Sequence, residues 1–233
     1  MEIEAADEGH IHRPEDLMAT VNHGWNWDKV DDAHWAKPSE DVFYFLDRWK
    51  DRGLNSILDL GCGIGRHSLL FAEKGFTVTA FDGSESGLAR LKASAHDANL
   101  PIATAVGDLT SLPFDDEKFD AILAYHSIYH VNSEGMKKAL TEVARILRPG
   151  GEIYMSIISK TDNSYTAAKC QTIDDNVRLK TEVDGTVLPH FFVHYDDIRT
   201  LLADWVILTV RQVEDLDDGK SSWHYFVHAM KGK

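Results

Sequence analysis

The central part of the chain alternates between two patterns of apolar and polar positions. Short runs of almost continuous apolar residues predict strands buried on both faces, because such strands leave no side for polar groups. Stretches with apolar residues three or four positions apart separate these runs and predict helices. The expected strands span residues 56–60, 76–81, 102–106, 119–125 and 153–158, and the expected helices span 67–74, 84–97 and 134–147.

Two further regions flank this centre. Residues 1–52 are rich in tryptophan and histidine, include an expected helix at 39–50, and predict an N-terminal helical cap or lid. Residues 161–194 are the largest insertion between expected elements, with a predicted hairpin that turns at Asp184-Gly185. The hairpin strands are expected at 176–183 and 186–193, followed by a helix at 196–202 and strands at 205–213 and 222–230.

Strands that alternate with helices of this length predict an α/β fold, with a mostly parallel sheet and helices on both faces. We therefore expect one main domain over residues 53–233 behind the cap. In such a sheet the ligand binds at the carboxyl ends of the strands. The residues expected there are 59–65, Asp82, Asp108 and 125–130.

The balance of 24 Lys and Arg against 38 Asp and Glu gives a formal charge of −14 over 233 residues. Nucleic-acid binding depends on neutralising phosphates, so this charge argues against a nucleic-acid partner. No apolar run approaches the roughly 20 residues of a membrane helix, and the start of the chain at Met1 lacks an apolar signal core. The two cysteines, Cys62 and Cys170, do not form a disulfide scaffold, and a reducing cytoplasm is the expected location.

A glycine-rich turn links the first expected strand to its helix, at Gly61, Gly63 and Gly65. Glycine permits positive φ and a close approach of ligand to backbone. Asp82 follows about 20 residues later, where a carboxylate can accept hydrogen bonds from both hydroxyls of a ribose. This arrangement alone fits a nicotinamide cofactor as well as other nucleosides, and it also fits a tight connection without any ligand.

Two details of the turn favour a different nucleoside. The glycines have G-x-G-x-G spacing and not the G-x-G-x-x-G of dinucleotide sites. Asp59 precedes the first glycine by two residues and would repel a pyrophosphate, whereas it would tolerate an ammonium or a sulfonium. Asp108 follows the third expected strand and offers an acceptor for an adenine amino group.

Five motifs in order resemble the class I S-adenosylmethionine-dependent methyltransferase family, over about residues 53–160. They are 57–65 (ILDLGCGIG), 81–84 (FDGS), Gly107-Asp108, 112–114 (LPF) with Phe119-Asp120, and 147–151 (LRPGG). The resemblance implies a seven-stranded Rossmann-like sheet whose last strand is antiparallel. It also implies S-adenosylmethionine as cofactor and S-adenosylhomocysteine as product.

The resemblance assigns parts of the cofactor to residues. Asp59 and the glycines are expected at the methionine part, Asp82 at the ribose and Asp108 at the adenine. Cys62 lies inside the turn, where a small residue that fits is the simpler explanation and a reactive thiol the alternative. The full set expected at the cofactor is Asp59, Gly61, Cys62, Gly63, Gly65, Asp82, Gly83, Asp108, Leu109 and Tyr125.

Acceptor-side residues are expected after the fourth strand and in the insertion. His126 and Tyr125 are the candidate catalytic residues, since imidazole has a near-neutral pKa and suits a general base. Alternatively, the two side chains could only line the cofactor site without taking part in catalysis. Residues expected to contact the substrate are Trp35, His130, His190 and Phe191. His126 and His130 have the spacing of a metal pair, with His190 and His194 as further ligands, but no carboxylate completes a tight motif and no metal is predicted.

The cap and the insertion are expected to enclose this site. Trp25, Trp27 and Trp35 could stack on a sulfonium or an aromatic acceptor, or could simply pack the cap onto the sheet. The favoured function is methylation of a small molecule. A nicotinamide-dependent oxidoreductase and a non-catalytic protein that binds an adenosyl cofactor are the alternatives, and nothing in the sequence indicates the oligomeric state.

Overall fold

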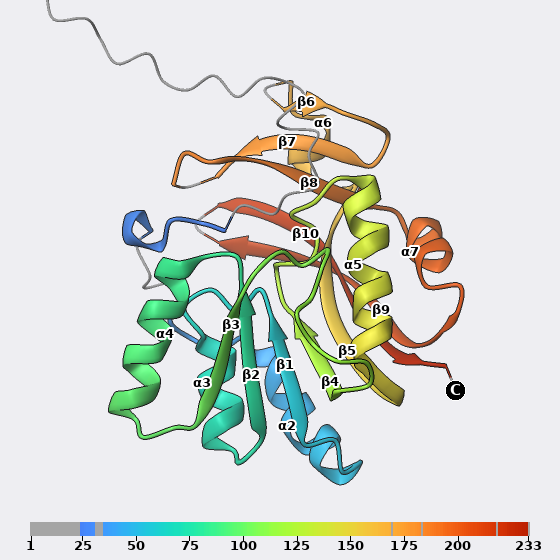
Figure 1. Cartoon of the computed structure of the whole chain (residues 1–233). Helices are drawn as coiled ribbons and strands as arrows, with labels where there is room; N and C mark the ends of the chain where they lie inside the picture. Colours follow the sequence, from blue (N-terminus) through green and yellow to red (C-terminus); the bar gives the residue numbers. More distant parts are fainter. Residues whose placement is uncertain (1–23, 31–34, 169, 183, 218, 233) are drawn as a thin grey trace, which may run out of the picture.

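A twisted sheet forms the centre of the molecule in the computed structural model, which describes residues 24–30, 35–168, 170–182, 184–217 and 219–232 (Figure 1). Ten strands are linked in this sheet, and seven of them make up its main part. The strands lie in the order β3-β2-β1-β4-β5-β10-β9, and β10 is antiparallel to both neighbours. All other pairs within these seven strands are parallel. The strands are β1 (Ser56–Leu60), β2 (Thr77–Asp82), β3 (Ile102–Val106), β4 (Phe119–Ala124), β5 (Leu147–Ser159), β9 (Trp205–Asp217) and β10 (Lys220–Lys231). The expected fold class is confirmed.

Helices cover both faces of this sheet, and the strand sequences show why. Along β1, Ile57 packs with α2 and α3, whereas Leu58 and Leu60 pack with α5 and α7. Alternate residues of β4, β5 and β10 divide in the same way between the two apolar clusters. The helices are α2 (Glu40–Asp51), α3 (Arg66–Glu73), α4 (Glu85–Asp97), α5 (Ser133–Ile146), α7 (Tyr195–Leu201), the short α6 (Asn163–Thr166) and the 3-10 turn η1 (Trp27–Lys29).

The insertion adds the other three strands at the carboxyl end of β5. Its strands are β6 (Gln171–Thr172), β7 (Val177–Thr181) and β8 (Val187–Val193), and β8 joins β5 through two residue pairs. The hairpin is confirmed, but its two-residue turn is wrong, since the strands end at Thr181 and Val187. The backbone N–H of Glu182 still donates to Thr186, and Gly185 has a φ of +87° that closes this longer loop.

The helix expected within residues 1–52 is α2. It packs against the sheet through Val42, Phe45 and Trp49, which are at most 3% exposed. The part of the predicted cap at residues 1–23 and 31–34 lies outside the described residues. Residues 24–30, which we call the strap, and Trp35 lie instead at the carboxyl ends of the strands.

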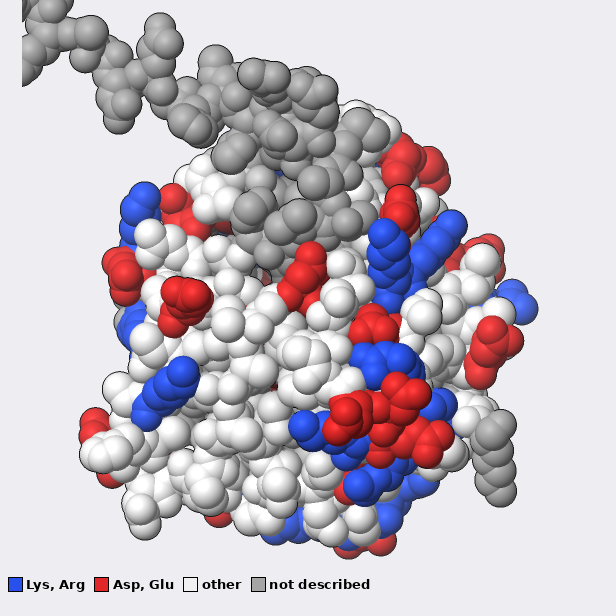
Figure 2. Space-filling model, viewed as in Figure 1, with Lys and Arg blue, Asp and Glu red and all other residues white. Residues whose placement is uncertain are grey.

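Charged side chains of both signs are intermingled on the face shown in Figure 2, and basic residues form no continuous patch there. Within the described residues, no helix is long and apolar enough to cross a membrane.

Candidate active site

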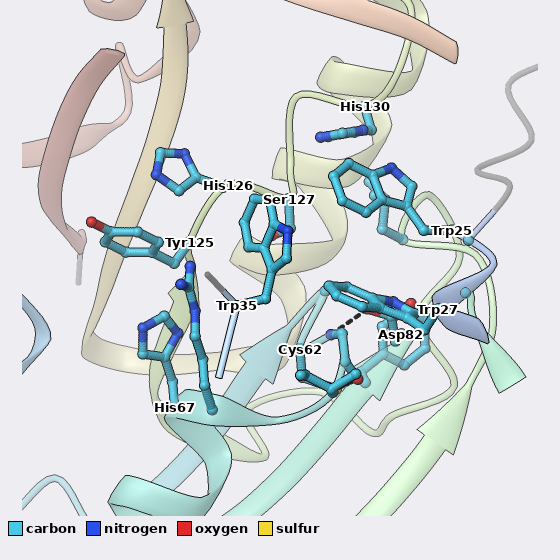
Figure 3. Close-up of a pocket in the computed structure, with 18 residues that line it drawn as sticks. Trp25, Trp27, Trp35, Cys62, His67, Asp82, Tyr125, His126, Ser127 and His130 are labelled. Atoms are coloured by element: carbon cyan, nitrogen blue, oxygen red, sulfur yellow. Dashed lines mark hydrogen bonds between the residues drawn. The ribbon is translucent and has the colours of Figure 1, made fainter. Parts of the chain in front are cut away.

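A cavity opens at the carboxyl ends of β1, β2 and β4, where the sequence places the ligand site (Figure 3). The glycine turn and Asp82 form its floor, the loop after β4 forms one wall, and the strap covers it. In Figure 3, Trp25 and Trp27 lie on one side of the cavity, with Tyr125 and His126 on the other. The fold therefore brings together three parts of the predicted site that are far apart in the sequence.

The glycine turn requires glycine for two separate reasons. Gly61 and Gly63 have φ values of +74° and +56°, in the left-handed region that side chains disfavour. A Cβ on Gly61 would lie 2.2 Å from the Cβ of Ser127, and a Cβ on Gly63 would lie 2.5 Å from the indole of Trp27. The backbone N–H groups of Gly61 and Cys62 both donate to the carbonyl of Phe81, at 2.7 and 3.0 Å. The turn is thus tied to the end of β2, and its glycines let Ser127 and the indole of Trp27 pack directly on its backbone.

Asp82 is buried at the edge of the turn. Its Oδ2 accepts from the N–H of Gly63 and its Oδ1 from the N–H of Ser84, each at 2.7 Å. Burial raises the pKa of this carboxyl, and the backbone bonds from the turn act against that rise. A carboxylate offers about four acceptor positions, so two remain for ligand hydroxyls.

The strap is held on both sides of the cavity. The carbonyl of Trp25 accepts from Ser84 Oγ at 2.6 Å, and the N–H of Trp27 donates to Ser86 Oγ at 3.1 Å. On the other side, the N–H of Asn26 donates to Oδ2 of Asp184, at the tip of the β7–β8 hairpin, at 2.8 Å. The strap therefore links the start of α4 to the insertion.

Three indole rings meet beneath the strap. The centroids of Trp25 and Trp27 are 5.5 Å apart, and Trp35 lies edge-on to Trp25 at the same distance. The ring of Trp25 also lies 6.0 Å from that of His130. Trp35 and His130 are both among the residues that line the cavity, and their contact with a substrate stays a prediction.

His126 occupies an unusual backbone position directly after β4. Its φ is +54°, which is uncommon for a residue with a side chain and occurs mostly at constrained sites. The backbone N–H of His126 donates to Ser156 Oγ at 2.7 Å, and the same oxygen lies 3.2 Å from Nδ1 of the ring. A serine hydroxyl can donate one hydrogen bond and accept two, so Ser156 anchors Nδ1 in either tautomer of the ring.

The surroundings of His126 keep this ring neutral. Burial, together with the neighbouring His224 ring 4.4 Å away, lowers the pKa of His126 well below its usual value. Burial also lowers the pKa of His224 to about 4. Tyr125 is neutral as well, because burial raises its pKa to about 12. The wall after β4 is consequently polar but uncharged.

Several residues expected at the cofactor lie outside the cavity lining. Asp59 is 2% exposed and accepts from Ser68 Oγ at 2.6 Å, so it stabilises the start of α3 from beneath the turn. Gly65 precedes α3 and faces the side chain of Leu91. Asp108 accepts from the N–H and hydroxyl of Thr110, both at 2.8 Å. The residues of the expected cofactor set that do line the cavity are Gly61, Cys62, Gly63, Asp82, Gly83, Leu109 and Tyr125.

The substrate contacts expected from the insertion are not found in the cavity lining. Phe191 packs in the apolar core beside α5. His190 lies behind His130, with ring centroids 4.6 Å apart, and its Nε2 is 2.9 Å from Oε1 of Glu182. The insertion thus supports the cavity wall from behind. Burial raises the pKa of Cys62 well above its usual value, so this thiol is protonated and the explanation as a small residue that fits the turn is the better one.

Sequence reasoning missed two lining residues that adjoin predicted ones. Arg66 starts the helix after the turn, and Phe81 precedes Asp82. Their positions next to strand ends were the available signal. Among the described residues, no group of histidine, cysteine and acidic side chains is arranged to hold a metal ion.

Comparisons with known proteins agree with this geometry. Residues 57–151 match the family model described as a methyltransferase domain. A glycine/sarcosine N-methyltransferase of Parasynechococcus marenigrum is 32% identical over 128 residues, which cover 54% of this chain and 45% of that protein. A ubiquinone biosynthesis O-methyltransferase of Pseudomonas fluorescens is 28% identical over 153 residues, covering 63% and 62%.

Solved structures share the fold across more of the chain. A SAM-dependent methyltransferase from Methanosarcina mazei has a TM-score of 0.68 at 20% identity, covering 84% of this chain and 99% of that one. Residues 57–151 thus match a methyltransferase domain, and the fold of the chain is that of the solved SAM-dependent methyltransferase. It spans about half to two thirds of the length of the curated relatives it matches.

Proposed function

We propose that this chain binds S-adenosylmethionine and transfers its methyl group to a small molecule. The observation that carries the proposal is the single cavity shared by the glycine turn, Asp82 and the aromatic wall after β4. The first two suit a nucleoside with an amino-acid end. The wall after β4 presents an uncharged surface to the acceptor, because its histidine and tyrosine, His126 and Tyr125, are neutral.

The residues present fit the cofactor. At Gly61 and Gly63 the turn adds no side chain of its own, and the side chains of Ser127 and Trp27 lie directly against these two glycines. Asp82 has two acceptor positions left for ribose hydroxyls. Leu109 and Phe81 supply apolar contacts beside it. S-adenosylmethionine supplies an activated methyl group on a sulfonium, so the protein needs to provide binding and alignment.

The chain's own residues are suited to orienting an acceptor and excluding water. Ser156 and Tyr129 hold the ring of His126 through Nδ1, which leaves Nε2 for an acceptor. With a proton on Nε2 the ring would donate a hydrogen bond to an acceptor oxygen or nitrogen, and without one it would serve as the general base expected from the sequence. The strap and its indoles would close the cavity against water, which strengthens the polar contacts inside.

A small acceptor is the class that the cavity supports best. The strap covers the cavity, and the formal charge of −14 disfavours nucleic acid. The relatives point the same way, since one is named for ubiquinone biosynthesis and another for glycine and sarcosine. A structural neighbour from Burkholderia thailandensis contains 1,6-didemethyltoxoflavin and S-adenosylhomocysteine, at a TM-score of 0.63.

Calorimetric titration tests the proposal, with S-adenosylmethionine, S-adenosylhomocysteine and a nicotinamide dinucleotide as ligands. We expect micromolar binding of the two adenosyl compounds and none of the dinucleotide. Transfer of a labelled methyl group to a panel of small metabolites then separates an enzyme from a non-catalytic cofactor-binding protein. Binding of the dinucleotide alone would overturn the proposal.

A further inference from the structure

Arg66 places a positive charge in the wall of the cavity without a carboxylate partner. It is the first residue of α3, and its Nη1 donates to the carbonyl of Lys37 at 3.3 Å. Among the residues that the structure describes, no acidic side chain lies within ion-pair distance of it. Burial lowers the pKa of this guanidinium, so the protein holds the charge at a cost.

Among the described arginines, Arg178 also lacks a carboxylate partner, but its N–H groups donate to three backbone carbonyls, whereas most of the others form ion pairs. Arg48 pairs with Glu152 at 2.7 Å, Arg145 with Glu142 at 2.8 Å, and Arg211 with Asp41 at 2.7 Å. Acidic residues outnumber basic ones by 38 to 24, so carboxylates are abundant.

The two acidic residues nearest to the turn are engaged elsewhere. Asp59 bonds to Ser68 and attracts Arg66 only from beyond ion-pair distance, and both oxygens of Asp82 accept from backbone N–H groups. Arg66 is thus left with donors that no described side chain uses.

Two aromatic rings orient the guanidinium. Its central carbon lies 5.2 Å from the ring centroid of Trp35 and 5.7 Å from that of Tyr125. Aromatic faces hold an arginine while leaving the N–H groups at its edge available. A guanidinium presents five N–H donors in a fork that matches a carboxylate, and only one donor is used by Lys37.

We propose that Arg66 binds a ligand carboxylate in this cavity. The inference rests on the proposed function, because the ligand is the cofactor or its acceptor. The carboxylate belongs either to the amino-acid end of the cofactor or to an anionic acceptor. A single positive charge opposite the buried Asp82 suits a monoanion, whereas a phosphate or pyrophosphate would bring more negative charge than the cavity balances.

The test compares two adenosyl ligands that differ in the amino-acid end. S-adenosylhomocysteine carries a carboxylate and 5′-deoxy-5′-methylthioadenosine carries none, and both are titrated by calorimetry into wild type, Arg66→Met and Arg66→Lys. If the cofactor supplies the carboxylate, Arg66→Met weakens S-adenosylhomocysteine at least tenfold and leaves methylthioadenosine unchanged. Arg66→Lys keeps the charge and loses the forked set of donors, so its affinity for S-adenosylhomocysteine should lie between those of wild type and Arg66→Met.

The second arm addresses the acceptor. Benzoate and acetate are titrated into the protein already loaded with S-adenosylhomocysteine. If the acceptor supplies the carboxylate, one of these binds to wild type, its binding is lost in Arg66→Met, and S-adenosylhomocysteine affinity stays unchanged. Arg199→Met, on the exposed face of α7, is the matched control and should leave the affinities for the adenosyl ligands and for the carboxylates unchanged.

Two results would overturn the inference. In one, Arg66→Met weakens both adenosyl ligands equally, which would mean that Arg66 only shapes the turn. In the other, no carboxylate compound distinguishes the variant from wild type. If wild type itself binds neither adenosyl ligand, the proposed function fails, and this result is separate because it appears before any variant is made.

Discussion

The indole of Trp27 lies directly on Gly63. A Cβ on that glycine would come within 2.5 Å of the ring, so no other residue fits while the strap is in place. The strap therefore rests on the backbone surface that is proposed to receive the cofactor. We expect a ligand that contacts the backbone of Gly63 to displace this ring, so that the strap opens during binding.

Removing the contact should speed ligand entry. We expect Trp27→Ala to increase the association rate of S-adenosylhomocysteine, measured by stopped-flow fluorescence of the remaining tryptophans. Asp184→Ala should act in the same direction, because it removes the acceptor for the N–H of Asn26 without touching the cavity. Asp97→Ala, at the exposed end of α4, is the control. Unchanged association rates in both strap variants would show that the strap does not gate entry.

Asp82 should dominate cofactor affinity. We expect Asp82→Ala to weaken S-adenosylhomocysteine at least 100-fold in calorimetry, since it removes ribose acceptors and also loosens the bond that positions Gly63. Asp108→Ala should have a much smaller effect, because its side chain bonds to Thr110 and lies outside the cavity lining. An affinity of Asp82→Ala within twofold of wild type would contradict the ribose assignment.

Two substitutions of His126 separate its backbone from its ring. Asparagine tolerates a φ of +54° better than alanine does, so His126→Asn should keep nearly wild-type stability and His126→Ala should lose about 1 kcal/mol. Both lack the imidazole and should lower turnover of an acceptor by about 10–100-fold, with cofactor affinity kept. Thermal unfolding and single-turnover methyl transfer are the measurements, and equal turnover in wild type and His126→Asn would exclude a role for the ring.

The pH dependence of turnover follows from the lowered pKa of His126. Burial lowers the pKa of His126 well below its usual value of 6.5, so the ring stays neutral and should not titrate between pH 6 and pH 9. A flat profile over that range is expected for an acceptor that does not itself ionise. An inflection near pH 6.5 that disappears in His126→Asn would show that the ring gains and loses a proton during turnover.

Much of the fold followed from local sequence patterns. The ends of β1 and β3 were predicted to the residue, since each is a short apolar run bounded by polar or turn-forming residues. The parts that could not be predicted depend on tertiary contacts. The position of α2 against the sheet is fixed by Trp49 and Glu152, 103 residues apart, and no local pattern shows such a contact.

The candidate site shows the same limit. Strand ends located Asp82, Tyr125 and His126 correctly in the cavity lining, because parallel strands end at one edge of a sheet. The direction of a side chain within a turn is decided by its neighbours. Asp59 points beneath the turn because Ser68 on α3 offers it a hydroxyl, a contact that the motif alone does not reveal.

Glu152 offers a test of stability that is independent of ligands. This side chain is fully buried and accepts from Arg48, from Nε1 of Trp49 and from Nε2 of His228, at 2.7 to 3.1 Å. Although burial alone would raise the pKa of Glu152, the hydrogen bonds from His228 and Arg48 bring it down to about 2. The ionised carboxylate thus joins α2 to β5 and β10.

Because the pKa of Glu152 is lower in the folded state, its ionised carboxylate stabilises the fold above the unfolded pKa, near 4.5. This stabilisation is lost as the pH falls toward 2. We expect Glu152→Gln to reduce the free energy of unfolding by about 3 kcal/mol at pH 7, the usual cost of breaking a buried ion pair. The difference from wild type should shrink steadily between pH 4.5 and pH 3. Urea unfolding at each pH measures it, with the exposed Glu134→Gln on α5 as a control that changes little. A difference that stays constant with pH would mean that the ionised carboxylate does not hold α2 on the sheet.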